Sequence, residues 1–293
     1  MSYRGRFAPT PSGDLHLGGA RTAIVAHLLA RRAGGRFVLR VEDLDRPRAV
    51  PGAEERILAD LRALGVDWDE GPDVGGPHAP YRQSERTALY EARLEELRRA
   101  GLAFPCFCSR AEVARASQAP HGPSDDGPRY PGTCRALSEA QQSERARTRQ
   151  PSWRFRVPEG AAAIVKVVDQ IAAPFEEDVA QTVGDFVLRR SDGIFAYQLA
   201  VVVDDVAMRI TDVVRGADLL SSAARQILLF KALGAAPPRF AHVPLVLGPD
   251  GARLSKRHGS IAAREHAATL GFPALRAQLL VSLPEGVVPP EAA

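Results

Sequence analysis

A glycine- and proline-rich turn near the start of the chain constrains its fold more than any other feature. Residues 4–24 read RGRFAPTPSGDLHLGGARTAI. Residues 4–8 have the pattern of a short strand, and residues 20–32 carry apolar side chains at helical spacing. Residues 36–43, RFVLRVED, alternate apolar and charged side chains and predict a second strand. A strand, a helix and a strand in this order predict a parallel βαβ unit, and hence an α/β fold.

The turn itself has the composition of a ligand-binding loop. Gly18 and Gly19 allow the backbone to approach a ligand closely. The helix that follows presents unpaired N–H groups and a partial positive charge, which favour phosphate. His16 adds a side-chain donor. These residues indicate a nucleotide site, but a tight turn with a surface histidine explains the same stretch equally well.

The rest of the chain alternates between helical and extended patterns. Residues 53–64 and 84–100 predict amphipathic helices, and Ser84 is the expected cap of the second. Residues 186–205 hold two apolar runs around a Ser-Asp-Gly turn, which is typical of a hairpin of two strands. The last part of the chain predicts a helix, a strand and a helical tail, over 219–233, 240–247 and 261–293.

Composition and charge exclude several classes of protein. The apolar runs are far shorter than the roughly 20 residues of a membrane span, and the first residues, MSYRGRF, lack the apolar stretch of a secretory signal. We therefore expect a cytoplasmic protein with no membrane partner. A monomer is the expected oligomeric state, but it does not follow from these observations. A net charge of +3 permits phosphate-rich partners without requiring them. Arginine supplies nearly all the positive charge, because the lysines are Lys166, Lys231 and Lys256.

Cysteines fall in a segment that is poor in apolar residues, over 105–150. The chain has 3 cysteines, and an odd number in a chain of cytosolic character argues against a disulfide framework. Cys106, Cys108 and Cys134 can supply three of the four ligands of a structural zinc site, with His121 as the ordinary fourth ligand by chemistry. The alternative is three free thiols buried as small apolar side chains.

A second motif gives the opening turn a more specific meaning. Residues 253–257 read RLSKR in a glycine-rich loop far downstream. With residues 14–19, DLHLGG, they resemble the two signature motifs of class I aminoacyl-tRNA synthetases in order and separation. The segments RVEDLD, AYQLAVVVDD and VVRGADLL are similar to the glutamyl/glutaminyl branch of that family. The resemblance covers most of residues 4–260. It implies a Rossmann-type catalytic domain that activates L-glutamate with ATP and Mg²⁺.

The resemblance also implies roles for particular side chains. Lys256 stabilises the charge that develops at the α-phosphate, and Arg253 stands where the family usually has a lysine. His16, Gly18 and Gly19 bind the ATP. The resemblance also implies that His16, like Lys256, is a catalytic residue. The glutamate pocket is then formed by Arg6, Phe7, Ala8, Pro9, Thr10, Glu42, Tyr197 and Arg215.

Two of these residues have plainer interpretations from the sequence alone. Glu42 could be a surface carboxylate paired with Arg40 or Arg46, an interaction worth little. Tyr197 lies in an apolar run that predicts a strand, where a tyrosine usually belongs to the core.

The cysteine pattern and the length of the chain are similar to one subgroup of the family. Members of this subgroup attach glutamate to queuosine in the anticodon loop of tRNA(Asp), and they activate glutamate without tRNA. They bind zinc through C-x-C and Y-x-x-x-C, which implies Tyr130 rather than His121 as the fourth ligand. The predicted organisation has four parts and no anticodon-binding domain: a first Rossmann half, a zinc-binding insertion, a second Rossmann half and a helical end, over 1–104, 105–150, 151–260 and 261–293.

Overall fold

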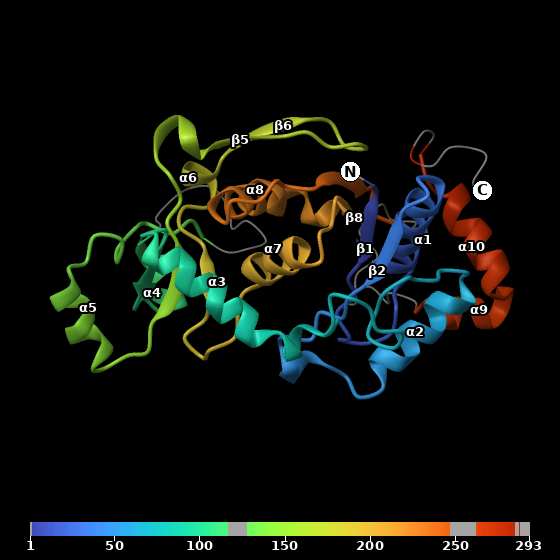
Figure 1. Ribbon diagram of the computed structural model, residues 1–293, viewed down its shortest axis with the longest axis horizontal. Helices are drawn as coiled ribbons and strands as arrows, with labels where there is room; N and C mark the ends of the chain where they lie inside the picture. The colour runs from blue at the N-terminus through green and yellow to red at the C-terminus, as the bar shows by residue number, and fades with distance from the viewer. Residues whose placement is uncertain (1, 117–127, 247–261, 285–286, 288–293) are drawn as a thin grey trace.

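A four-stranded parallel sheet lies at the centre of the molecule, in the order β2-β1-β8-β9 (Figure 1). The computed structural model describes residues 2–116, 128–246, 262–284 and 287. The expected βαβ unit is present, because β1 pairs with β2 in parallel and α1 connects them. The prediction of a Rossmann-type parallel sheet is therefore confirmed. The elements are β1 (Arg4–Phe7), α1 (Leu17–Arg32), β2 (Arg36–Leu39), β8 (Asp212–Gly216) and β9 (Arg239–Val243).

The strand order creates a crevice at one edge of the sheet. From β1 the chain moves outward to β2, and much later it returns beside β1 as β8 and moves outward to β9. The order therefore reverses between β1 and β8. In parallel α/β sheets, ligands bind at the carboxyl ends of the strands beside such a reversal. The opening turn follows β1 and lies at this edge.

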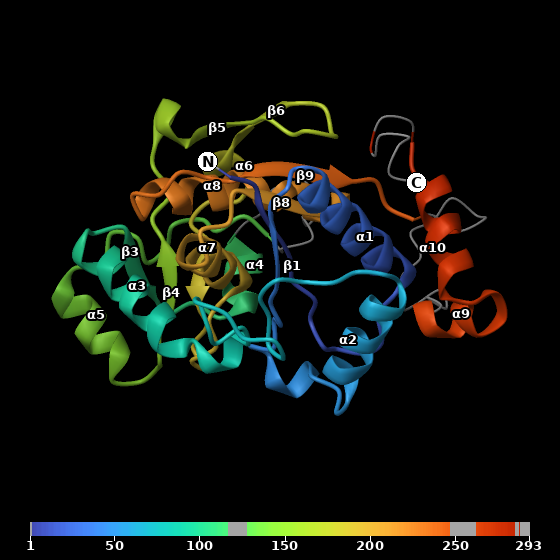
Figure 2. The same cartoon turned by 45° about the vertical axis from the view of Figure 1, so that its right-hand side comes forward.

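Helices from both ends of the chain pack against one side of the sheet. The chain's last two described helices lie beside α1 and α2 at one end of the molecule (Figure 2). They share an apolar core with the sheet, which includes Ile24, Leu61 and Leu275. The Arg276 guanidinium also donates to the Leu64 carbonyl oxygen at 2.6 Å. These helices are α2 (Ala53–Ala63), α9 (Ala263–Leu270) and α10 (Phe272–Val281).

A second apolar core forms where α7 is surrounded by helices and strands of the other half. Tyr90, Leu94 and Leu97 of α3 share a buried face, as their spacing predicts. A two-stranded hairpin packs near α8. The elements are α3 (Thr87–Arg99), α7 (Tyr197–Ala207), α8 (Ala223–Ala232), β5 (Ile164–Val167) and β6 (Phe175–Asp178).

Two local predictions about these helices are wrong. Residues 196–205 were expected to form a strand, but Tyr197 begins helix α7. Residues 198–205 of this helix are all buried, and three consecutive valines are also typical of a buried strand, so the sequence favoured a strand. Ser84 does not cap α3, which begins at Thr87. It lies in a short 3₁₀ turn, where its hydroxyl donates to Asp43 at 2.5 Å.

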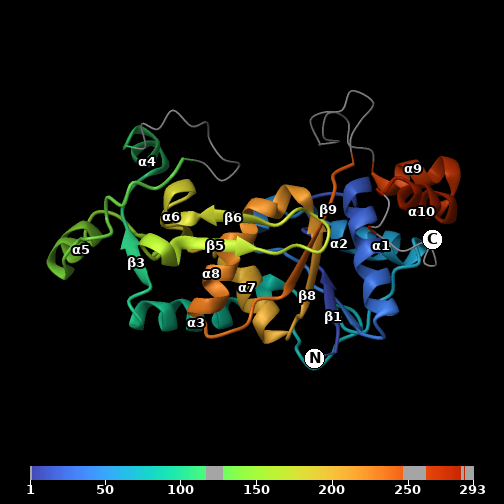
Figure 3. The same ribbon diagram turned by 90° about the horizontal axis from the view of Figure 1, so that it is seen from above.

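The cysteine segment lies at the end of the molecule opposite α9 and α10 (Figure 3). Its core is small and contains Phe104, Phe107, Val113 and the three cysteines with Tyr130. Among the residues described, no helix is both long and apolar enough to cross a membrane. The elements of this part are β3 (Ala103–Cys106), β4 (Ser152–Phe155) and β7 (Val187–Arg189), which form an antiparallel sheet, with α4 (Arg110–Ala116), α5 (Glu139–Ala146) and α6 (Val179–Thr182).

Candidate active site

A cavity of about 420 Å³ opens at the carboxyl ends of the parallel strands. The ends of β1 and β8, the opening turn and the first residue of α7 form its walls. The structure thus brings together every predicted ATP and glutamate residue that it describes. These are Arg6, Phe7, Ala8, Pro9, Thr10, His16, Gly18, Gly19, Glu42, Tyr197 and Arg215.

His16 forms the N-cap of α1 and closes the turn over the helix N-terminus. Its Nδ1 accepts a hydrogen bond from the Gly19 amide at 2.9 Å. In the neutral ring the proton is then on Nε2, so this nitrogen is a donor. A Cβ on Gly18 would lie 3.2 Å from His16 Nδ1, so glycine lets the ring lie against the backbone. The geometry suits an anion at the helix N-terminus.

Two guanidinium groups from neighbouring strands line the cavity. Arg6 on β1 and Arg215 on β8 are each only 4% exposed. Burial lowers the pKa of Arg215, the charge of Arg6 lowers it further, and Tyr197 opposes the shift. Two partly desolvated cations side by side favour a carboxylate between them.

The carboxylate of Glu42 lies at the same cavity and is held from behind by Arg40. Arg40 is completely buried and donates to Glu42 at 3.1 Å and to Asp205 at 2.7 Å. Glu42 is therefore paired with Arg40, one of the two partners considered, but it is not a surface residue. Burial raises the pKa of Glu42, while Arg40 and Arg6 oppose the shift. An ammonium group in the cavity would favour its charged form.

Both described ends of the segment that carries the lysine motif lie at this cavity. Val246 lines it, and Ala262 forms a backbone bridge with His16. The Ala263 amide donates to the Leu15 carbonyl oxygen at 2.7 Å. Lys256, Arg253 and His121 lie outside the described residues.

A second cavity of about 1080 Å³ adjoins the first. Thr10, Glu42 and Tyr197 line both, so the two cavities share a wall. The second extends to Cys108 and Tyr130 in the cysteine segment. Its lining also includes arginines and aspartates from loops: Asp45, Arg48, Arg190 and Asp192.

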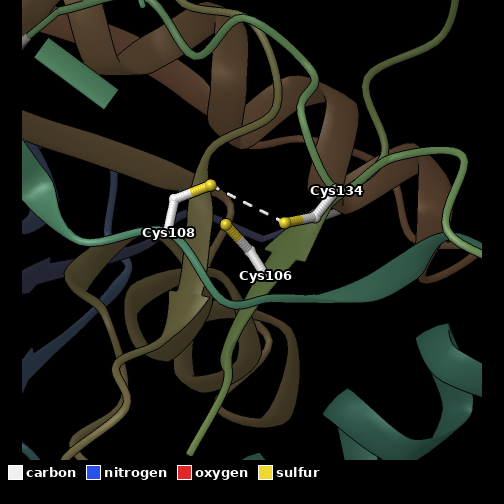
Figure 4. A group of neighbouring side chains, drawn as sticks. All are labelled: Cys106, Cys108 and Cys134. Carbon is white, nitrogen blue, oxygen red and sulfur yellow. Dashed lines mark hydrogen bonds between the residues drawn. The ribbon is translucent and has the colours of Figure 1, made fainter. Parts of the chain in front are cut away.

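The three cysteine sulfur atoms converge on one point (Figure 4). Cys108 Sγ and Cys134 Sγ are 3.6 Å apart, and all three sulfur atoms lie within 4.8 Å of one another. Tyr130 Oη is 3.3 Å from Cys106 Sγ. Hydrogen bonding from Cys134 lowers the pKa of Cys106 to about 4, against the effect of burial. None of the three cysteines lines the first cavity.

These distances are compatible with a tetrahedral zinc ion. Thiolates about 2.3 Å from the metal lie about 3.8 Å apart in that geometry. The donor set of three sulfur atoms and one oxygen also suits zinc. The side chains of Cys106, Cys108, Cys134 and Tyr130 would hold the ion.

Sequence reasoning missed most of the buried residues behind the cavity and considered Arg40 only as a surface partner of Glu42. Asp205 and Arg40 support Arg6 and Glu42, and Asp169 contacts His242, which in turn contacts Arg215. Charged residues inside apolar segments are the signal that could have identified Asp205 and Arg40. An example is the pair of aspartates after the valines of α7. No local signal exists for Asp169 and His242, because 73 positions separate them.

The comparisons with known proteins agree with this architecture. The family model of class I tRNA synthetases (E and Q), catalytic domain, matches residues 2–281. The chain belongs to this family. It is therefore an enzyme of the class I aminoacyl-tRNA synthetase type, with the fold that the parallel sheet indicates.

Relatives within the family carry two kinds of name. Glutamyl-Q tRNA(Asp) synthetase of Symbiobacterium thermophilum is 57% identical over 88% of this chain and 79% of its own length. The protein of the same name from Nitratidesulfovibrio vulgaris is 48% identical over 98% and 87%. Glutamate–tRNA ligase 1 of Halorhodospira halophila is 49% identical over 89% of this chain and 54% of its own.

A solved structure of the family has the same fold. Glutamate-tRNA synthetase from Elizabethkingia anophelis superposes with a TM-score of 0.77 at 37% identity, over 88% of this chain and 53% of that one. The chain thus spans about half the length of the glutamate–tRNA enzymes that it matches.

Proposed function

We propose that this protein activates L-glutamate with ATP and transfers it to queuosine in the anticodon loop of tRNA(Asp). The observation that carries the proposal is the convergence of Arg6, Glu42, Tyr197, Arg215 and His16 on one cavity. A half-buried carboxylate and two buried guanidinium groups complement the ammonium and the carboxylates of glutamate. Relatives named Glutamyl-Q tRNA(Asp) synthetase support this substrate pair.

Activation requires positioning more than proton transfer. The nucleophile is the glutamate α-carboxylate, which needs no general base, and it attacks the α-phosphate of ATP with loss of pyrophosphate. His16 and the α1 N-terminus with Gly18 and Gly19 would bind the phosphates. Arg6 and Arg215 would bind the side-chain carboxylate, with a hydrogen bond from Tyr197, and Glu42 would bind the ammonium. Lys256 would meet the negative charge that develops in the transition state.

The second cavity suits the acceptor. It meets the first at Thr10, Glu42 and Tyr197. A base that lies there would have its hydroxyl next to the activated carboxyl group. The alternatives are transfer to the 3′ end of tRNA(Glu) and a non-catalytic tRNA-binding role.

One experiment separates these three functions. Labelled glutamate and ATP are supplied with queuosine-bearing tRNA(Asp), unmodified tRNA(Asp) or tRNA(Glu), and ATP–pyrophosphate exchange is measured without tRNA. We expect exchange without tRNA, as the similarity to the subgroup that activates glutamate without tRNA implies, and label only on queuosine-bearing tRNA(Asp). Label on tRNA(Glu) would instead identify a glutamyl-tRNA synthetase activity. If neither exchange nor label is observed, only the non-catalytic tRNA-binding role remains.

We also propose that the cysteine cluster binds one structural zinc ion with Tyr130 as fourth ligand. The small core around the cysteines leaves this part of the chain dependent on a further crosslink. We expect about one zinc per purified chain by elemental analysis, and loss of the metal in Cys134→Ser. Tyr130→Phe should lower the zinc affinity about tenfold or more, because it removes an oxygen ligand.

His121→Ala provides the matched control for Tyr130→Phe. If Tyr130 is the ligand, the His121 variant keeps its zinc. Loss of zinc from His121→Ala with retention in Tyr130→Phe would assign the ligand to His121, and a folded, active protein without zinc would end the proposal.

A further inference from the structure

A buried chain of three side chains connects β9 to the wall of the first cavity. His242 on β9 is 1% exposed and lies between Asp169 and Arg215. Its Nδ1 is 2.5 Å from Asp169 Oδ2, and Arg215 Nε donates to its Nε2 at 2.9 Å. These residues come from three separate parts of the sequence, so the fold alone brings them together.

The donors in this chain determine where the ring proton lies. A guanidinium can only donate, so His242 Nε2 must be unprotonated to accept from Arg215. The ring proton is then on Nδ1, which donates to Asp169. Burial lowers the pKa of His242, with Arg215 contributing, which favours this neutral form.

Asp169 is fixed in place by the backbone. Its Oδ1 accepts from the amides of Ile171, Ala172 and His242 at 2.9, 2.8 and 3.1 Å. Burial alone would raise the pKa of Asp169, but these bonds and the imidazole lower it to about 2. The carboxylate is therefore ionised at neutral pH and holds the ring in one orientation.

Arg215 is held at two of its three nitrogens. Nε donates to His242, and Nη1 donates to Gln226 Oε1 at 2.7 Å. Gln226 is in turn hydrogen-bonded to Gln198 at 3.0 Å. The remaining nitrogen, Nη2, is buried and has no hydrogen-bond partner among the described residues. Arg215 lines the first cavity, so its remaining donor is left for a ligand.

The partners of Arg215 differ in charge from those of Arg40. Arg40 is paired with Asp204, Asp205 and Glu42, which balance its charge. Arg215 forms no ion pair within the described part of the chain, and the acceptors of its hydrogen bonds to His242 and Gln226 are a neutral imidazole and a neutral amide. A neutral acceptor orients a guanidinium without neutralising it. The full charge of Arg215 is thereby kept for a carboxylate in the cavity.

We propose that Asp169 and His242 are positioning residues that orient Arg215 toward the side-chain carboxylate of the amino-acid substrate. The inference rests on the proposed function, since it names the group that Arg215 meets. Neither residue lines the first cavity. Their effect is on affinity for glutamate and on discrimination between glutamate and glutamine, which lacks the second carboxylate.

Two substitutions at His242 test the proposal, and a third serves as control. His242→Leu keeps much of the volume but removes the acceptor, and His242→Gln replaces Nε2 with an oxygen acceptor. His27→Leu is the matched control, because His27 is also buried and contacts an aspartate and an arginine, Asp67 and Arg31, but does not line the cavity.

We expect His242→Leu to raise the KM for glutamate about tenfold or more in ATP–pyrophosphate exchange, because Arg215 loses its orienting bond. The KM for ATP should not change. The preference for glutamate over glutamine, as a ratio of kcat/KM values, should fall by a similar factor. His242→Gln should retain most of the wild-type values, and His27→Leu should change none of them.

Asp169→Asn gives the same test if His242→Leu fails to fold by circular dichroism. The Asn oxygen would accept from the three backbone amides, so its NH₂ would face His242 Nδ1. The ring proton would move to Nε2 and point at the Arg215 N–H, and we expect the same rise in the KM for glutamate.

The outcomes separate this inference from the proposed function. No glutamate-dependent exchange in the wild-type protein would refute the function itself. Exchange in the wild type with a His242→Leu variant indistinguishable from His27→Leu would overturn the positioning role. Equal losses for glutamate and ATP would also overturn it, since they indicate a general structural effect.

Discussion

Replacement of Arg215 with Ala should reduce kcat/KM for glutamate in ATP–pyrophosphate exchange by about 100- to 1,000-fold, because it removes a buried, charge-assisted hydrogen-bond donor. Arg215→Lys should show an intermediate loss, since lysine keeps the charge but not the planar fork. The KM for ATP should change little. Steady-state exchange assays over a range of glutamate concentrations measure all three values.

Arg4→Ala is the control for this experiment. Arg4 lies on the neighbouring strand and pairs with Glu70, but it does not line the cavity. Thermal denaturation of each variant separates a loss of binding from a loss of fold. Near wild-type kinetics in a folded Arg215→Ala protein would remove Arg215 from the site.

Replacement of Lys256 with Ala should lower the exchange rate at saturating substrates by about 100- to 1,000-fold, the usual effect of deleting one group that stabilises transition-state charge. The KM for glutamate should stay near its wild-type value, because the ammonium acts on the phosphate. The thermal stability should be unchanged. The measurement is kcat for exchange with both substrates well above KM.

Lys166→Ala and Lys231→Ala are matched controls, since the chain has no other lysines. Both variants should keep the wild-type rate. A Lys256→Ala protein that exchanges at this rate would exclude the lysine from the chemistry, whatever the motif resembles.

The periodicity of the sequence predicted most of the helices and strands around the cavity. The turn between β1 and α1 was visible because glycine and proline interrupt regular patterns, and α1 was visible because Ile24, Val25, Leu28 and Leu29 recur at helical spacing. The prediction failed for α7, where three consecutive valines are equally typical of a buried strand. The predicted start of α3 at Ser84 was wrong because the Ser84 hydroxyl donates to the carboxylate of Asp43, which is distant in sequence.

The residues of the candidate site also fall into those that the sequence predicted and those that it did not. Residues of the opening turn could be assigned from local sequence and from the resemblance, and the structure places them on one cavity. Asp169, Asp205 and His242 could not be assigned, and Arg40 was considered only as a surface partner of Glu42. Their contacts join positions far apart in the chain, and only the folded sheet determines which buried charges meet.

The wall shared by the two cavities has a practical consequence for inhibitor design. Thr10, Glu42 and Tyr197 line both cavities and form the wall between them. A bisubstrate compound that joins a non-hydrolysable glutamyl group to a bulky nucleoside-like arm could occupy both cavities at once. Amino-acid analogues without the arm would fill only the smaller one, so the length of the linker across Tyr197 becomes the variable that a medicinal chemist would optimise.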